Sequence, residues 1–192
     1  MKRLKSILVA LAVLLAAPAQ GHGPAELGDD GLHKADWMRD TFKDLREDLA
    51  EASAEGRRLM LLIEQRGCIY CKKMHEEVFP LPEVHDYIHE NFLVVQLNMF
   101  GDVEVTDFDG ETLPEKEMIR KWGLLFTPTM LFLPEAVPDG QTAAGAAVAT
   151  VPGAFGRYTT RHLMEWVVRK GYEGSETFQK YHARRLTERG LN

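Results

Sequence analysis

The chain contains two cysteines, Cys68 and Cys71, which are separated by Ile69 and Tyr70. Within this chain, Cys71 has no other cysteine with which it can form a disulfide. A pair this close forms a small, strained and accessible ring, which is typical of a labile or catalytic disulfide rather than a structural one. Metal sites use the same spacing, so the motif alone does not decide between redox chemistry and metal binding.

A zinc finger is the main competing interpretation of the motif. Cys68 and Cys71 are followed, after thirteen residues, by His85 and His89, which is close to the spacing of a C2H2 finger. Two prolines interrupt the intervening stretch, and apolar runs typical of buried strands flank it. We therefore expect no metal site here, and we expect His85 and His89 on one exposed helix face.

The first cysteine stands where a strand is predicted to pass into a helix. Residues 59–63 form a continuous apolar run, which predicts a buried strand, and the pattern is helical from Cys68 to about residue 78. The amides and macrodipole at a helix start stabilise an anion, so the thiol pKa of Cys68 is expected below its usual value of about 8.5. Cys71 lies one turn further into the helix, where access is poorer. The prediction is that Cys68 attacks a partner and Cys71 resolves the mixed disulfide.

Charged and titratable side chains accompany the pair on the same helix. Lys72 lies four residues after Cys68 and adds positive potential near its sulfur. Lys72 also stands where a covalent haem motif requires histidine, so that interpretation fails. His75 lies four residues after Cys71, where it either stabilises a thiolate or shuttles a proton, or is a solvated helix residue.

The start of the chain predicts export. Basic residues, an apolar run at 7–17 and Ala-Pro-Ala at 17–19 have the layout of a secretory signal peptide over residues 1–19. The apolar run is far short of the roughly 20 residues that a membrane-spanning helix needs. Loss of the three basic residues in this segment takes the formal charge from −6 to −9. Such an acidic chain is a poor partner for nucleic acid, and we expect no stable membrane insertion.

The rest of the pattern predicts alternating helices and strands. Helices are expected at 36–55, 83–91, 114–122 and 159–172 and in the last eighteen residues, with Phe178, Tyr181 and Leu186 facing inward. Strands are expected at 92–98, 129–133 and 148–151, with a small hairpin at 103–110. This order indicates an α/β fold with a central mixed sheet flanked by helices. We divide the mature chain into a flexible linker at 20–35, one domain at 36–174 and a C-terminal helical extension at 175–192.

A second motif, Thr127-Pro128-Thr129, stands directly before a predicted strand. A proline there suits a tight turn, and cis prolines in folded proteins are usually functional features. With the strand–Cys-Ile-Tyr-Cys–helix sequence, this motif resembles the thioredoxin superfamily over about residues 36–172. The resemblance implies a thioredoxin fold in which a cis-proline loop faces the cysteines. The substrate-contacting positions are then expected to be Ile69, Tyr70, Thr127 and Pro128.

Three further stretches sharpen the resemblance. These are Gly-Cys-Ile-Tyr-Cys-Lys-Lys-Met-His-Glu-Glu-Val-Phe at 67–79, Val-Val-Gln-Leu-Asn at 94–98 and Val-Thr-Asp-Phe-Asp-Gly at 105–110. They resemble the periplasmic SoxW-type thioredoxins of bacterial sulfur-oxidation systems. That resemblance implies a periplasmic thiol–disulfide oxidoreductase that draws electrons from a membrane thiol carrier and passes them to disulfide-containing exported proteins. It implies no cofactor beyond the cysteine pair.

The chain also departs from ordinary thioredoxin. Ile-Tyr replaces Gly-Pro between the cysteines, and thioredoxin's buried aspartate falls here on Leu62. Glu64 is then the nearest acid that can take the proton of Cys71, unless it is an exposed residue at the strand end. The acidic insertion at 99–113 precedes the helix before the cis-proline, and it either contacts a partner or is simply solvated.

The direction of electron flow stays open at this point. The same parts serve a reductase, an oxidase or a disulfide isomerase, depending on the reduction potential, and the family resemblance favours a reductase. A non-catalytic binding module of the same fold is the remaining alternative.

Overall fold

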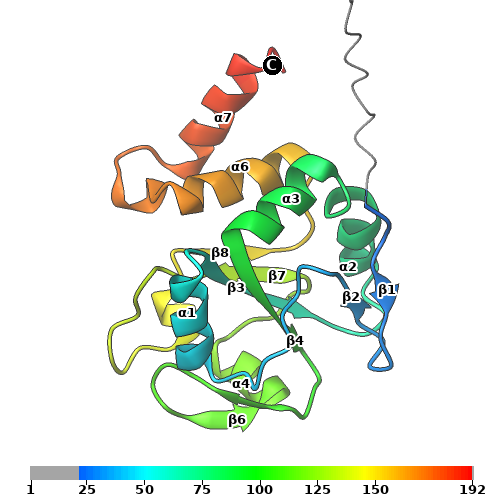
Figure 1. Ribbon diagram of the computed structural model, residues 1–192, viewed down its shortest axis with the longest axis vertical. Coiled ribbons are helices and arrows are strands. Elements are labelled where there is room, and N and C mark those ends of the chain that lie inside the picture. The colour runs from blue at the N-terminus through cyan, green and yellow to red at the C-terminus, as the bar shows by residue number, and fades with distance from the viewer. Residues whose placement is uncertain (1–21, 192) are drawn as a thin grey trace, which may run out of the picture.

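A mixed four-stranded sheet forms the centre of the molecule. The computed structural model describes residues 22–191, and the sheet has the order β4-β3-β7-β8 (Figure 1). The strands are β3 (Arg58–Glu64), β4 (Phe92–Asn98), β7 (Thr129–Phe132) and β8 (Ala149–Pro152). β3 pairs in parallel with β4, whereas β7 is antiparallel to both of its neighbours. The predicted α/β fold with a mixed sheet is confirmed.

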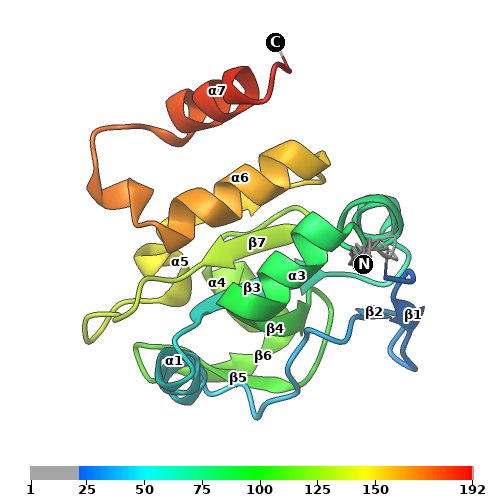
Figure 2. The ribbon, with the colours of Figure 1, turned by 45° about the horizontal axis from the view of Figure 1, so that its top comes forward.

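Helices cover both faces of this sheet because β3 is apolar on both sides. Leu59, Leu61 and Ile63 pack into one core with α1 (Leu45–Ala54) and α4 (Glu115–Lys121). Met60 and Leu62 face the other core, beneath α3 (Pro82–Asn91) and α6 (Arg157–Val168). Figure 2 shows α1 and α6 on opposite sides of the sheet. All residues of β3 are buried, as a continuous apolar run predicts.

The helix that we predicted over 36–55 begins only at Leu45. Lys43 has a left-handed backbone with φ of 58°, and the Asp44 side chain accepts hydrogen bonds from the amides of the first turn. Phe42, whose spacing to Leu45 and Leu49 suits the apolar face of a helix, is 97% exposed. Trp37 is nevertheless buried, since the extended chain around it runs beside β4. The prediction is therefore wrong for residues 36–44.

The segment predicted as a flexible linker, 20–35, contains a β-hairpin in its described part. β1 (Glu26–Leu27) pairs antiparallel with β2 (His33–Lys34). Leu32 is buried, and the ammonium of Lys34 donates to Gln96 of β4 at 2.7 Å. The linker prediction is wrong for these residues, because strands of two residues give almost no periodic signal and are stabilised by contacts distant in sequence.

The acidic insertion at 99–113 is folded against α4. Its hairpin lies further along than the predicted 103–110, with β5 (Glu104–Thr106) pairing with β6 (Thr112–Pro114). The buried carboxylate of Asp107 accepts a hydrogen bond from the Trp122 indole at 2.8 Å. Lys121 of α4 forms ion pairs with Asp109 and Glu111. These bonds argue against a merely solvated insertion.

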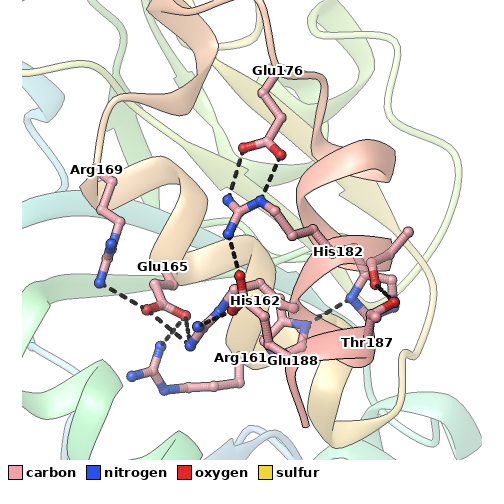
Figure 3. A network of polar contacts seen from close by, with 11 residues as sticks. Arg161, His162, Glu165, Arg169, Glu176, His182, Thr187 and Glu188 are labelled. Atoms are coloured by element: carbon pink, nitrogen blue, oxygen red, sulfur yellow. Dashed lines mark hydrogen bonds and ion pairs between the residues drawn. The ribbon is translucent and has the colours of Figure 1, made fainter. Parts of the chain in front are cut away.

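The predicted extra C-terminal helix is α7 (Phe178–Glu188), which packs against α6 after the short η2 (Gly171–Glu173). Figure 3 shows the polar network between α6 and α7. Arg185 of α7 donates to Glu165 of α6 at 3.3 Å. In the same network the Nδ1 atoms of His162 and His182 lie 2.9 Å apart. Tyr181 is buried as predicted.

One expectation falls outside this description. The signal-peptide prediction concerns residues 1–19, which lie outside the described part of the chain. Among residues 22–191, no helix is long and apolar enough to cross a membrane.

Candidate active site

The two cysteines lie at the junction between β3 and α2 (Ile69–Lys73), as predicted. Gly67 has φ of 73°, a left-handed conformation that lets the chain turn tightly out of the strand. Cys68 then occupies the N-cap of α2, where its Sγ accepts a hydrogen bond from the Cys71 amide at 3.0 Å. The two sulfurs form a disulfide. Cys68 is 8% exposed and Cys71 only 1%, so Cys68 is the sulfur nearer to solvent.

The loop before β7 lies against the disulfide. The Thr127–Pro128 peptide bond is cis, and the Thr127 hydroxyl donates to the Cys68 Sγ at 3.4 Å. The carbonyl of Pro128 is in turn bonded by the Gly153 amide at 2.7 Å, which anchors the loop to the segment after β8. Thr127 and Cys68, about sixty residues apart in the sequence, are therefore in direct contact, as the proline motif predicts.

Apolar side chains surround this contact at the surface. Ile69 and Tyr70 on the start of α2 are 72% and 57% exposed. Leu125 and Phe126, just before the cis peptide bond, are 77% and 64% exposed. Sequence reasoning singled out the first two and missed the second two, although both directly precede the Thr-Pro motif.

Glu64 and His75 form a buried pair on the sheet side of α2. His75 Nε2 lies 3.0 Å from Glu64 Oε1, and Gln96 donates to Glu64 Oε2 at 2.6 Å. Both Glu64 and His75 are 1% exposed. Of the alternatives stated above, the exposed strand-end glutamate and the solvated helix histidine are therefore wrong.

The burial of this pair follows from spacing that the sequence contains. Cys71, Met74, His75 and Val78 recur as i, i+3, i+4 and i+7, which is one face of a helix, and all are buried across α2 and the π-helical η1 (Met74–Val78). Glu64 ends a fully buried strand two residues after Leu62 and so shares its face.

Two further side chains extend the buried pair toward the N-terminal hairpin. The His33 ring stacks on His75 with centroids 4.5 Å apart, and the Gln96 amide also donates to the His33 carbonyl at 2.8 Å. Burial, with a smaller contribution from the nearby His75, lowers the pKa of His33. Neither His33 nor Gln96 was predicted as part of the site, because the hairpin that carries His33 was predicted as a linker.

The predicted lysine lies on the outer side of α2. Lys72 is exposed and pairs with Glu76 at 3.7 Å. It adds positive charge to the rim of the site but forms no hydrogen bond or ion pair with either sulfur, so its role in stabilising a thiolate stays a prediction.

Comparison with known proteins agrees with this geometry. Residues 45–158, more than half of the chain, match the model of the thioredoxin-like domain. The chain belongs to the thioredoxin-like family. A thioredoxin-fold protein from Helicobacter pylori superposes with a TM-score of 0.53 at 14% identity, covering 81% of this chain and 87% of that one, which supports the fold.

More distant superpositions were also found for this thioredoxin-like chain. A thioredoxin from Thermus thermophilus is 28% identical and covers 67% of this chain and 86% of its own, with a TM-score of 0.49. The C-terminal domain of DsbD from Neisseria meningitidis is 16% identical, covering 67% and 96%, with a TM-score of 0.44. No curated protein sequence matched the chain.

Two clusters in the described part of this thioredoxin-like chain have the donor atoms to hold a metal ion. One is His33, Glu64 and His75, and the other is His22, His85 and Asp86; in each, the donor atoms lie within 4.8 Å of one another.

His85, predicted on an exposed face with His89, is instead buried, and its Nε2 lies 2.8 Å from Asp36. The zinc-finger pairing is therefore not formed, since the disulfide occupies both cysteines and Asp36 engages His85.

Proposed function

We propose that this thioredoxin-like protein is a thiol–disulfide oxidoreductase in which Cys68 attacks and Cys71 resolves. The observation that carries the proposal is the placement of two donors on one sulfur. The Cys71 amide and the Thr127 hydroxyl lie 3.0 and 3.4 Å from Cys68 Sγ. Donors so placed stabilise a thiolate after the disulfide is reduced, and the thiolate is the nucleophile in disulfide exchange.

The reaction proceeds by two exchanges. The Cys68 thiolate attacks one sulfur of a partner disulfide, a Cys68–partner bond forms, and the other partner sulfur leaves as a thiolate that takes a proton from water. The Cys71 thiolate then attacks Cys68 Sγ, which restores the Cys68–Cys71 disulfide and releases the second partner thiolate. Two electrons pass from the cysteine pair to the partner, and no further cofactor is required.

The buried pair beneath α2 supports the second exchange. Cys71 is buried, so its thiol cannot lose a proton directly to bulk water. His75 follows Cys71 by one turn on the same buried face, and Glu64 is bonded to it. We assign to His75 and Glu64 the removal of the Cys71 proton, a task for which the sequence analysis named Glu64 as the nearest acid.

The exposed apolar side chains around the disulfide supply a surface for the partner. Ile69 and Tyr70 lie on one side of Cys68, and Leu125 and Phe126 precede Thr127 and Pro128 on the other. An unfolded or extended protein segment that carries a disulfide can bury these side chains while its cysteine reaches Cys68. In this proposal the backbone of Thr127 forms hydrogen bonds with the backbone of such a segment.

We further propose that the protein acts as a reductase in the periplasm and serves exported disulfide-containing proteins of a sulfur-oxidation system. The signal-like start of the chain and the SoxW-type motifs support this assignment. A membrane thiol carrier is the proposed source of electrons.

Trapping of the mixed disulfide tests the reaction. In Cys71→Ser, the first exchange proceeds and the second cannot, so a covalent complex with a disulfide substrate accumulates and is visible on a non-reducing gel. Cys68→Ser is the matched control and forms no complex. A Cys68→Ser protein that retains full activity would instead favour the non-catalytic binding module.

The reduction potential tests the direction. Equilibration with glutathione should place the Cys68–Cys71 couple near the value of about −270 mV that is typical of thioredoxins. A value near −120 mV, at the strongly oxidising end of the scale, would contradict the reductase assignment and favour a thiol oxidase.

A further inference from the structure

The N-terminal hairpin forms one wall of a groove that ends at the attacking cysteine. The groove has a volume of about 480 Å³. Leu27 and His33 of the hairpin line one side, and Arg66, Cys68 and Lys72 line the other. Thr127 and Pro128 are not among its lining residues, so the groove is distinct from the contact with the cis-proline loop.

The hairpin is fixed in place and can act as a wall. The Gln96 side-chain Nε2 donates to the backbone carbonyl of His33 at 2.8 Å, and the Lys34 ammonium donates to the side-chain Oε1 of Gln96 at 2.7 Å. The Arg66 side chain lies directly over Gly31, where an added Cβ would be 2.8 Å from Arg66 Cγ. The hairpin therefore rests on the loop that leads into Cys68, and any larger residue at position 31 would displace Arg66.

This wall is an addition to the thioredoxin-like domain. The residues that match the family model begin at Leu45, so the hairpin lies outside the shared domain. A partner that reaches Cys68 along this groove meets side chains that the shared domain does not provide.

The groove is cationic although the chain as a whole is acidic. Arg66 forms no ion pair with any described residue, and Lys72 is only loosely paired, 3.7 Å from Glu76. Asp29 is the one carboxylate that lines the groove, whereas the whole chain has a formal charge of −6. Leu27 and Ile69 add exposed apolar surface at 65% and 72%. An anionic group with an apolar neighbour matches this lining.

We propose that the groove binds an extended segment of the partner protein that carries an acidic residue close to its reacting cysteine. This inference rests on the proposed thiol–disulfide exchange and specifies the class of substrate. The partner's acidic side chain pairs with Arg66, and an adjacent apolar side chain contacts Leu27 and Ile69 while the partner disulfide faces Cys68.

Model substrates of matched length test the proposal. Three disulfide-linked peptide dimers differ only in having Glu, Gln or Lys two residues from the cysteine, and the rate of the first exchange is measured with Cys71→Ser at low salt. We expect Glu to react fastest and Lys slowest, with about two- to fivefold between Glu and Gln, as for an exposed ion pair. The order should weaken as salt is added, because exposed charges are screened.

Matched variants locate the effect. Arg66→Gln should abolish the difference between the Glu and Gln peptides, whereas Lys180→Gln, an equivalent loss of charge on exposed α7 outside the groove, should retain it. Leu27→Ala should slow all three peptides alike, and because Leu27 is exposed the substitution should not disturb folding.

Equal rates for the three peptides, or an order unchanged in Arg66→Gln, would overturn the proposal that the groove binds an acidic partner segment, and would leave the exchange reaction standing. Failure of every peptide to form the mixed disulfide would overturn the proposed function itself.

Discussion

At the scale of single residues, the site combines one sulfur near solvent, that of Cys68, with a buried sulfur, that of Cys71, and a buried acid, Glu64. Cys68 receives hydrogen bonds from Cys71 and Thr127 at the helix start, whereas Cys71 points into the buried side of α2. Beneath them, Glu64 is bonded to His75 and Gln96 with no Lys or Arg partner among the described residues. Burying an acid that has no cationic Lys or Arg partner costs free energy, and acids buried in this way are concentrated at functional sites.

The role of Glu64 can be tested separately from that of the cysteines. In Glu64→Gln, attack by Cys68 should keep its rate, whereas release of the partner by Cys71 should slow about 100-fold, the range for loss of a general base. Rapid mixing resolves the two steps as formation and decay of the mixed disulfide.

A control on η1, where Glu76 lies, separates the effect of losing a charge from the effect of its position. Glu76→Gln removes an exposed carboxylate beside Lys72 and should change neither step by more than about twofold, as for a surface ion pair. If Glu64→Gln left the decay of the mixed disulfide unchanged at every pH, the assignment of the Cys71 proton to this pair would be wrong.

At the scale of elements, the sequence predicts what is periodic and fails where stability comes from distant contacts. The strand at 92–98 is found at its predicted bounds, and the strand ending at Glu64 and the helix after Cys68 are also found, because long apolar runs and helical stripes are local signals. The β1–β2 hairpin was missed because Gln96, sixty residues away, provides its bonds. The false helical start at residue 36 arose because Trp37 was added to the helical spacing of Phe42, Leu45 and Leu49, although Phe42 is exposed and the helix begins at Leu45.

The same contrast divides the candidate site. The cysteines and the Thr127–Pro128 contact were predictable from motifs, and the burial of His75 was present in the i, i+3, i+4 stripe but was not used. His33 and Arg66 could not be assigned from the sequence, because their place beside Cys68 depends on where the hairpin docks.

At the scale of the whole molecule, the shared domain is flanked in sequence by two additions. The hairpin precedes the residues that match the family model, and α7 follows them (Figure 1). α7 packs on α6 through an interface that contains a pair of histidines, His162 and His182, as well as ion pairs. His162 is fully buried, and its Nε2 has no hydrogen-bond partner. Protonation of His162 would therefore place a positive charge inside this buried interface, which destabilises it.

The buried charge predicts a loss of stability in acid. Burial, followed by the adjacent His182 and the arginines of α7, lowers the pKa of His162 to about 4. The unfolded chain binds the proton near the ordinary pKa of about 6.5, before the folded chain does, so the free energy of unfolding falls as pH decreases from about 6.5 to about 4. Above this window His162 contributes no pH dependence.

His162→Phe keeps a buried ring without a titrating group, so the slope of unfolding free energy against pH should decrease by at most about 1.4 kcal/mol per pH unit, the value for one proton. Urea unfolding at a series of pH values measures this slope, with His89→Phe on the exposed side of α3 as the control that should leave it unchanged. An identical slope in the wild-type protein and in His162→Phe would show that the α6–α7 interface does not carry the acid sensitivity.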